Sequence, residues 1–305
     1  MQKFELTVLG CSSATPTSNR NPSAQFLNIA EHYFLIDCRE ATQIQLRRFK
    51  IKFQKIDHIF ISHLHGDHYL GLMGLLSSMH LLGRTNSLTL YCAPELQKII
   101  ELQHQYSMTR LKYPIKYRYL NYDKSETLYE DEKLLVETVI LKHRIPCCGF
   151  IFREKEGMKN LIKEKIEHYK IPQSEYLGIK KGADFIMDNG KKISNTEITT
   201  APDSPRSYAY CSDTCYDESI LEKIANVNLL YHEATFMNDK HARAVETYHS
   251  TTTQAGTIAK KANVKKLMIG HYSARYKDLE PMLIETKAVF ENTILAIEGE
   301  KYRIE

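Results

Sequence analysis

Three histidines and one aspartate lie within a single six-residue segment of this chain. The segment is His63-Leu64-His65-Gly66-Asp67-His68, and it follows an apolar stretch, residues 56–62, that reads as a strand. Imidazole and carboxylate groups together suit zinc and similar divalent ions, and a loop at a strand end can direct several side chains at one point. The alternative is a histidine-rich surface turn, which is unusual without a metal. The segment therefore predicts a metal site, with Gly66 allowing a tight turn.

Further ligands are expected elsewhere, because two metal ions need about seven or eight protein ligands. Three candidates follow predicted strands: His143 after residues 133–141, Asp213 after residues 208–211 and His271 after residues 265–269. Taken singly, such a histidine is more often a core or surface residue, and such an aspartate a turn or cap. Their shared placement at strand ends is the argument for a joint site.

The rest of the chain alternates predicted strands and helices. Other strands are expected at residues 4–9, 33–36, 88–91, 115–120 and 228–231, and helices at 41–49, 69–82, 94–107, 252–261 and 279–290. Residues 153–192 interrupt the alternation with a lysine-rich and glutamate-rich stretch that has few core candidates. We expect an α/β sandwich, one domain over residues 1–305, with an inserted arm at 153–192.

The composition is that of an ordinary globular protein, with 43% apolar and 26% charged residues. No apolar run approaches the roughly 20 residues that span a bilayer, and the start Met1-Gln2-Lys3-Phe4-Glu5 lacks a signal peptide's basic and apolar regions. The seven cysteines contain no CxxC pair, so reduced thiols are expected. We expect a cytoplasmic protein without a membrane segment. A net charge of +4 permits nucleic-acid binding without requiring it.

The histidine loop, followed in order by His143, Asp213 and His271, resembles the metallo-β-lactamase superfamily over nearly the whole chain. His232-Glu233-Ala234-Thr235 and His249-Ser250-Thr251 resemble the HEAT and HST motifs of its ribonuclease Z family, and residues 9–21 resemble that family's N-terminal loop. The resemblance implies a metallo-β-lactamase αβ/βα sandwich with an inserted flexible arm. It also implies a zinc-dependent endoribonuclease that removes the 3′ trailer from precursor tRNA, leaving a 3′-hydroxyl on the tRNA and a 5′-phosphate on the trailer.

The resemblance further implies two Zn²⁺ ions per subunit, with Mn²⁺ as an alternative. One ion would be held by His63, His65 and His143, the second by Asp67, His68 and His271, with Asp213 bridging both. Asp67 would also serve as the base toward water, and His249, paired with Glu233, would donate a proton to the departing oxygen. Without the resemblance, Glu233 would be interpreted as a surface carboxylate and His249 as a residue before a helix cap.

The family's arm grips the elbow of tRNA, and family members usually form homodimers. The resemblance thus implies a homodimer, and the RNA-binding candidates are Arg20, Lys159, Lys163, Lys180 and Lys181. The alternative for the arm is a solvated loop, because glutamates offset much of its charge. Residues 171–178 depart from the Gly-Pro-rich arm of bacterial members, and Ser18 stands where many members have lysine. The apolar stripe Leu70, Leu72, Met73, Leu75 and Leu76 suits either a dimer interface or ordinary core.

Two other functions remain open from the sequence. A small-molecule phosphodiesterase or other hydrolase of the same superfamily would keep the metal site and change the substrate. It would cleave small phosphodiesters and leave folded precursor tRNA intact. A non-catalytic tRNA-binding or assembly protein would bind zinc without hydrolysing any phosphodiester, although every expected ligand position holds a residue able to bind metal.

Overall fold

The computed structural model describes residues 3–305. Met1 and Gln2, on which part of the expectation about a signal peptide rests, lie outside the described residues. Within residues 3–305, no helix is both long and apolar enough to cross a membrane.

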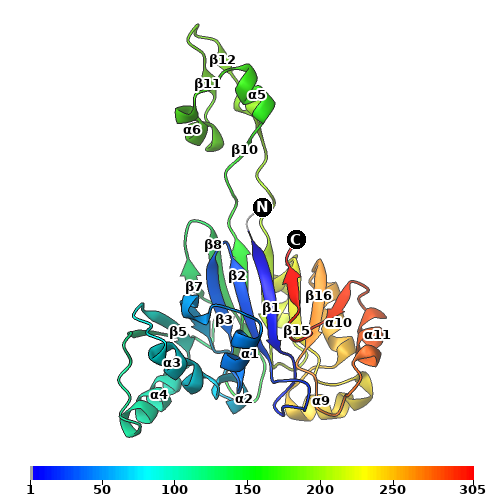
Figure 1. The fold of residues 1–305 in the computed structure, drawn as a ribbon. Helices are drawn as coiled ribbons and strands as arrows, with labels where there is room; N and C mark the ends of the chain where they lie inside the picture. Colours follow the sequence, from blue (N-terminus) through cyan, green and yellow to red (C-terminus); the bar gives the residue numbers. More distant parts are fainter. Residues whose placement is uncertain (1–2) are drawn as a thin grey trace.

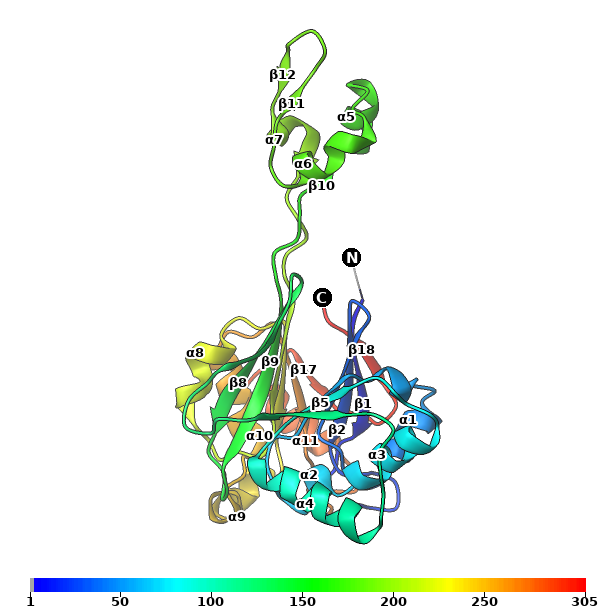
Figure 2. The same ribbon diagram turned by 90° about the vertical axis from the view of Figure 1, so that its left-hand side faces the viewer.

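Two mixed seven-stranded sheets pack face to face within the described part of the chain (Figures 1 and 2). The first has the order β18-β1-β2-β3-β4-β5-β6 and the second the order β17-β16-β15-β14-β9-β8-β7. The strands of the first sheet are β1 Phe4–Gly10, β2 Ala24–Ile29, β3 His32–Ile36, β4 His58–Phe60, β5 Leu88–Cys92, β6 Ile115–Tyr119 and β18 Lys301–Arg303. Those of the second are β7 Thr127–Glu130, β8 Leu134–Leu141, β9 Cys147–Glu154, β14 Ser207–Cys211, β15 Leu229–Glu233, β16 Lys266–Gly270 and β17 Thr293–Leu295.

Both sheets follow the same plan, an antiparallel part joined to a parallel part. Strands β1 to β3 are antiparallel and β3 to β6 parallel. Strands β7, β8, β9 and β14 are likewise antiparallel, and β14 to β17 parallel. The last strand, β18, crosses back to pair with β1 of the first sheet. The parallel strands of each sheet end together, so residues that follow them meet at one edge.

Helices cover the outer face of each sheet (Figure 1). On the first sheet they are α1 Thr42–Arg48, α2 Gly66–Tyr69, α3 Leu72–Leu81 and α4 Pro94–Tyr106. On the second they are α8 Leu221–Ile224, α9 His241–Thr247, α10 Thr252–Lys261 and α11 Glu280–Lys287, and short 3₁₀ turns lie at Phe53–Lys55, Glu218–Ile220 and Asn238–Lys240. Buried leucines of α3 pack on the outer side chains of β3 and β5, such as Leu35 and Leu90. The predicted α/β sandwich is therefore confirmed.

Aromatic side chains form much of the core between the two sheets. Phe34 and Phe60 of the first sheet meet Phe152 and Phe150 of the second at ring-centroid distances of 5.3 and 5.1 Å. All four are fully buried. Pairs of this kind contribute about 0.5–1.5 kcal/mol beyond their area burial, so this layer holds the two sheets, and the strand ends, in register.

Several elements differ from the sequence-based expectation. Strands β2 and β9 were not predicted, because buried polar residues in β2 and Gly149 in β9 interrupt the apolar pattern. The strands β7, β17 and β18, each of three or four residues, were not predicted either. The helix predicted at residues 69–82 is α3, which begins at Leu72, and the short helix α2 precedes it, separated by Leu70 and Gly71. A Cβ at Gly71 would lie 1.7 Å from the Arg39 carbonyl oxygen, so the chains touch there. Gly66 begins α2 instead of forming a tight turn with positive φ.

Residues 155–206, between β9 and β14, project far from the body of the molecule (Figures 1 and 2). Their elements are β10 Asn160–Leu161, α5 Lys163–His168, a 3₁₀ turn at Gln173–Glu175, α6 Tyr176–Lys180, β11 Phe185–Ile186, β12 Lys192–Ile193, α7 Asn195–Ile198 and β13 Thr199–Thr200. We call this projecting segment the arm. It has its own hydrophobic cluster of buried isoleucines, namely Ile166, Ile171, Ile179, Ile193 and Ile198. The predicted segment 153–192 stops short of the last two of them.

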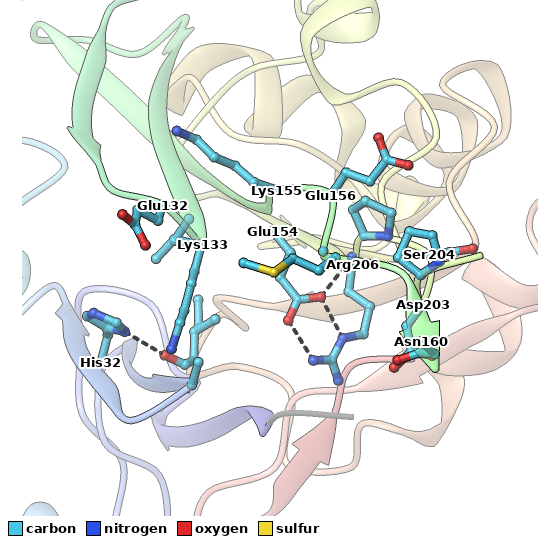
Figure 3. A pocket seen from close by; sticks show the side chains of 17 residues that line it. His32, Glu132, Lys133, Glu154, Lys155, Glu156, Asn160, Asp203, Ser204 and Arg206 are labelled. Carbon is cyan, nitrogen blue, oxygen red and sulfur yellow. Dashed lines mark hydrogen bonds and ion pairs between the residues drawn. The ribbon is translucent and has the colours of Figure 1, made fainter. Parts of the chain in front are cut away.

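The base of the arm is closed by a two-point ion pair between Glu154 and Arg206 (Figure 3). Arg206 donates from Nε to Oε2 at 2.8 Å and from Nη2 to Oε1 at 2.6 Å. Its Nη1 also donates to the Ile304 carbonyl oxygen at 3.2 Å, and its guanidinium lies over the Phe4 ring. The pair therefore ties both ends of the arm to β1 and to the C-terminal strand, beside a cavity of about 380 Å³.

Candidate active site

The predicted metal-binding residues meet where strands of both sheets end, near α2 and α9. In Figure 1 these helices lie at the lower edge of the sandwich, whereas the arm leaves the upper edge. The histidine loop follows β4, His143 follows β8, Asp213 follows β14 and His271 directly follows β16. The structure brings all seven predicted ligands together in neighbouring groups.

The first group consists of His63, His65, His143 and Asp213, whose ligand atoms all lie within 4.8 Å of one another. His65 Nδ1 lies 3.0 Å from His63 Nε2 and 3.1 Å from His143 Nε2. Asp213 Oδ2 is 3.9 Å from His63 Nε2 and from His143 Nε2. Three ring nitrogens and one carboxylate oxygen thus point at one position.

The second group consists of Asp67, His68 and His271. His68 Nε2 and His271 Nε2 lie 3.3 and 3.2 Å from Asp213 Oδ1, the other oxygen of the same carboxylate. Asp67 Oδ2 lies 3.7 Å from His68 Nε2. Asp213 therefore turns one oxygen toward each group, which is the arrangement a bridging ligand requires.

The chemistry of these donors fits divalent cations. His271 Nε2 is buried and makes no hydrogen bond within the described part of the chain, although Asp213 Oδ1 is near. Burial is the largest cause that holds the pKa of His63 and of His271 well below the usual 6.5, with His68 and Arg39 respectively among the groups that add to it. Both imidazoles are thus neutral at neutral pH, and neutral imidazole is the form that binds a metal.

The opposite nitrogen of most of these rings is fixed by a hydrogen bond. Tyr248 accepts from His143 Nδ1 through its carbonyl oxygen at 3.0 Å, and Thr235 Oγ1 lies 2.8 Å from His271 Nδ1. Asp37 Oδ2 lies 2.8 Å from His68 Nδ1, and Ser62 Oγ lies 3.0 Å from His63 Nδ1. Such outer contacts select the tautomer and orient the ring toward a metal.

These outer partners were not predicted from the sequence. Asp37 follows β3 and is fully buried, so the rule that found Asp213, a polar residue after a strand, applies to it as well. Tyr248 contributes a backbone carbonyl and adopts a left-handed conformation at φ 59°. The pattern of side chains in the sequence cannot predict a hydrogen bond to a backbone carbonyl oxygen.

Glu233, which is fully buried, pairs with the partly exposed His249 next to the second group. His249 Nδ1 lies 2.7 Å from Glu233 Oε1, which also accepts from the Thr214 N–H at 3.0 Å. Glu233 Oε2 accepts from the N–H and the hydroxyl of Thr235. Burial would lower the pKa of His249, but the charge and hydrogen bond of Glu233, with Asp213 and Asp67, raise it to about 9. With that pKa, the His249 imidazole is protonated at neutral pH.

The local sequence explains where His249 stands. Thr251 is the N-cap of α10 and forms a capping box with Gln254. Ser250 donates from its hydroxyl to the Thr214 carbonyl oxygen at 2.8 Å. These contacts fix the backbone directly after His249, so the interpretation of His249 as a residue before a helix cap is correct and is compatible with a role in the site.

The two groups and His249 open onto a surface cavity of about 370 Å³. Arg144, Arg243 and Arg275 line its rim, and all three are exposed. Asp67 and Ser13 also line it. These three arginines were not predicted, since each comes from a different loop or helix and they meet only in the folded chain. A rim of guanidinium groups around a metal-binding cavity suits a phosphate-containing substrate.

The predicted RNA-binding residues are divided between two places. Arg20 is 8% exposed and donates from Nη2 to the Tyr276 carbonyl oxygen at 2.5 Å. The four lysines lie on the arm, away from the metal-binding groups. Lys159 donates to Asn195 Oδ1 at 2.7 Å, Lys163 lies 3.9 Å from Glu167, and Lys180 and Lys181 lie at the end of α6.

Known proteins resemble the chain over different lengths. The family model described as "Anti-Pycsar protein Apyc1" matches residues 4–159, which include the histidine loop and His143 but neither Asp213 nor His271. The "Ribonuclease Z" of Phocaeicola vulgatus is 47% identical over 305 residues, which cover 100% of this chain and 99% of the relative. The "Ribonuclease Z" of Porphyromonas gingivalis W83 is 42% identical and covers 100% of both chains.

Solved structures show the same architecture. Human tRNase Z, short form, aligns with a TM-score of 0.71 and 26% identity over 99% of both chains. The metallo-β-lactamase fold protein YhfI from Bacillus subtilis aligns with a TM-score of 0.69 and 20% identity, over 99% of this chain and 100% of its own. The metallo-β-lactamase fold predicted from the sequence is confirmed by these likenesses.

Proposed function

The chain belongs to the ribonuclease Z family, and from this we propose that it is a metal-dependent endoribonuclease that removes the 3′ trailer from precursor tRNA. The observation that carries the proposal is the Glu233–His249 pair, which stands beside two neighbouring metal-binding groups at the floor of a cavity rimmed by arginines. A pair of this kind supplies a proton to a leaving oxygen, and the arginines suit a phosphodiester. The substrate itself comes from the family, since fold and site alone do not fix it.

We propose that the two groups hold two Zn²⁺ ions per subunit, with Mn²⁺ able to replace them. His63, His65 and His143 would hold one ion, Asp67, His68 and His271 the other, and Asp213 would contact both. When bound, two such cations supply Lewis acidity that activates water and offsets charge on the phosphate. Carboxylate donors and neutral imidazoles of this kind suit both metals.

Two residues of the chain carry out the two proton transfers of the reaction. The Asp67 carboxylate, at the cavity, accepts a proton from the attacking water as the water oxygen bonds to phosphorus. The bond from phosphorus to the 3′ oxygen of the tRNA breaks, and His249 protonates that oxygen. Glu233 accepts the His249 Nδ1 proton in a hydrogen bond, which leaves Nε2 to act toward the substrate. The products are a 3′-hydroxyl on the tRNA and a 5′-phosphate on the trailer.

We propose that Arg144, Arg243 and Arg275 bind phosphates on either side of the cleaved bond, and that the arm binds the tRNA body through lysines such as Lys159, Lys163, Lys180 and Lys181. Arg20, which is largely buried, would act by shaping the loop that ends near the site. The arm and the site lie at opposite edges of the sandwich (Figure 1), so an arm of one subunit is better placed to serve the site of another.

A homodimer would meet that requirement. Of the apolar stripe considered for an interface, Leu72, Leu75 and Leu76 are fully buried in the core, whereas Leu70 is 51% exposed. Ile44, Leu81 and Leu82 are exposed large hydrophobic residues of the same helical layer. We propose that this exposed set forms the face shared by two copies of the chain. A cytoplasmic location accompanies the proposal, since tRNA transcripts are made there in bacteria, the source of the ribonuclease Z sequences that are 42–47% identical.

The function is tested with a folded precursor tRNA that carries a labelled 3′ trailer. Purified protein with Zn²⁺ or Mn²⁺ is expected to cut just after the discriminator nucleotide, which is the unpaired nucleotide that follows the acceptor stem. Asp67→Asn is expected to abolish the cut. Asp239→Asn is a matched control, because Asp239 is an exposed carboxylate whose nearest ion-pair partner is Lys240. Hydrolysis of bis(p-nitrophenyl) phosphate with an intact precursor tRNA would instead make the chain a small-molecule phosphodiesterase.

A further inference from the structure

Arg39 is fully buried beside the second metal-binding group. It follows β3, and its Nη1 donates to the Ser12 carbonyl oxygen at 3.1 Å. Nη2 lies 2.8 Å from His68 Nε2, and Nη1 lies 3.5 Å from Asp67 Oδ2. A guanidinium group is always charged in proteins. A fixed positive charge thus contacts two of the three side chains of this group.

The guanidinium leaves the ligand direction of His68 open. Nη2 is 2.8 Å from Nε2 and only 3.5 Å from Nδ1. An atom 2.8 Å from Nε2 on its outward axis would be much farther from Nδ1, because that axis points away from the rest of the ring. Nη2 therefore lies beside the ring, and a cation can still reach Nε2. Arg39 acts on that cation through its charge and does not block its place.

The first group has no such neighbour. Within residues 3–305, the hydrogen bonds and ion pairs of His63, His65 and His143 involve no lysine or arginine. The Asp37 carboxylate does not neutralise Arg39 directly, since it lies on the Nδ1 side of His68 and accepts from Ser62 and Tyr210. Asp67 is the carboxylate within ion-pair distance of Arg39 among the described residues.

We propose that Arg39 lowers the affinity of the Asp67–His68–His271 position for its divalent cation, so that the two positions fill in order, the His63–His65–His143 position first. Like charges a few ångströms apart repel strongly in a buried site, where water screens them little. Arg39 offsets the charge that Asp67 would otherwise contribute to the second position. The inference rests on the two-metal site proposed above, and it makes occupancy of the second position depend on metal concentration.

The test is a titration of metal-free full-length protein with Zn²⁺, followed by native mass spectrometry and isothermal calorimetry. Wild-type protein is expected to bind two ions with dissociation constants that differ by at least ten-fold. Arg39→Gln, which keeps hydrogen bonding without the charge, is expected to tighten the weaker step by at least ten-fold. Arg39→Lys is expected to keep the two separate steps. Arg84→Gln is the matched control, since Arg84 is also buried but pairs with Asp57, which is not a proposed ligand.

Each result decides the proposal. Equal dissociation constants for the two ions in the wild-type protein, or an unchanged weaker binding step in Arg39→Gln, would overturn it. The wild-type measurement decides even if a variant fails to fold. Uptake of one ion by both proteins would also overturn it. Cleavage of precursor tRNA is measured separately, so failure of the loading order is distinguishable from failure of the proposed function.

Discussion

Breaking the Glu154–Arg206 pair tests whether the body of the protein holds the arm in a working position. The perturbation is Arg206→Met, which keeps much of the side-chain volume and removes the charge. The variant leaves the Glu154 carboxylate without the two N–H donors that bind it at 2.8 and 2.6 Å. It also removes the bond to the Ile304 carbonyl oxygen and the packing against Phe4.

The magnitude follows from burial. Loss of one partner of a buried ion pair costs about 3–5 kcal/mol when the other charge stays unpaired. The Arg206 side chain is 5% exposed but that of Glu154 is 17% exposed, and the backbone N–H of residue 206 still donates to Glu154 Oε2 at 3.0 Å, so the carboxylate keeps one hydrogen bond and some water. We therefore expect a loss of about 2–3 kcal/mol in the free energy of unfolding, or roughly 5–10 °C in Tm. Glu154→Gln in the same chain should recover part of it, because no unpaired charge remains.

The assay combines a double-mutant cycle in urea with steady-state kinetics. Because the pair joins both ends of the arm and lies far from the metal-binding groups, the variant should raise KM for precursor tRNA roughly five-fold, about 1 kcal/mol of binding. Hydrolysis of bis(p-nitrophenyl) phosphate should be unchanged. The control is the neighbouring pair Arg153–Glu137, at 3.6 Å and more exposed, whose coupling should stay below about 1 kcal/mol. Equal coupling in both pairs, or equal losses on both substrates, would refute the reasoning.

Three further outcomes are expected. Glu233→Gln removes the charge that raises the pKa of His249 to about 9, so the alkaline loss of kcat, which occurs as His249 loses its proton, should move to lower pH; an unmoved pH profile would show that His249 is not the proton donor. Replacing residues 158–203 by a short Gly-Ser link should leave the circular dichroism of the body and the hydrolysis of small diesters intact while precursor tRNA cleavage falls at least ten-fold, since the arm has its own core. Alanine at Arg144, Arg243 or Arg275 should weaken RNA binding for all RNA sequences. The slope of log affinity against log salt concentration should fall by about 0.7 for each phosphate that is no longer neutralised, and an unchanged slope would show that the phosphates bind elsewhere.

The metal-binding candidates were predictable because most of them are side chains that closely follow a strand, although Asp67 and His68 lie in α2. His143, Asp213 and His271 follow β8, β14 and β16, and strand ends of one sheet meet at one edge. The residues that support the site were less predictable. Tyr248 acts through its backbone, and Arg39 approaches His68 only because β3 and the histidine loop are neighbours in space.

The fold shows the same division. Strands with alternating patterns or continuous apolar runs were predicted, even where both faces are buried as in β14 and β15, whereas β2 and β9 were missed because buried polar residues in β2 and Gly149 in β9 interrupt the apolar pattern. The buried isoleucines of the arm are separated by charged residues, so the stretch reads as solvated although it contains a small core. The local sequence pattern indicates which face of a helix or strand is buried. It does not indicate which other segments of the chain pack against that face.

The division of the ligands between the two sheets has a consequence for biosynthesis. The histidine loop belongs to the first sheet, while His143, Asp213 and His271 belong to the second, and β18 closes the sandwich by pairing with β1. On a ribosome, a growing chain that has exposed only the first sheet holds neither the bridging carboxylate nor a complete set of donors for either cation. With the ligands proposed above, a nascent chain that ends before His271 lacks a donor for the second cation, and we expect it to be inactive toward the RNA around it.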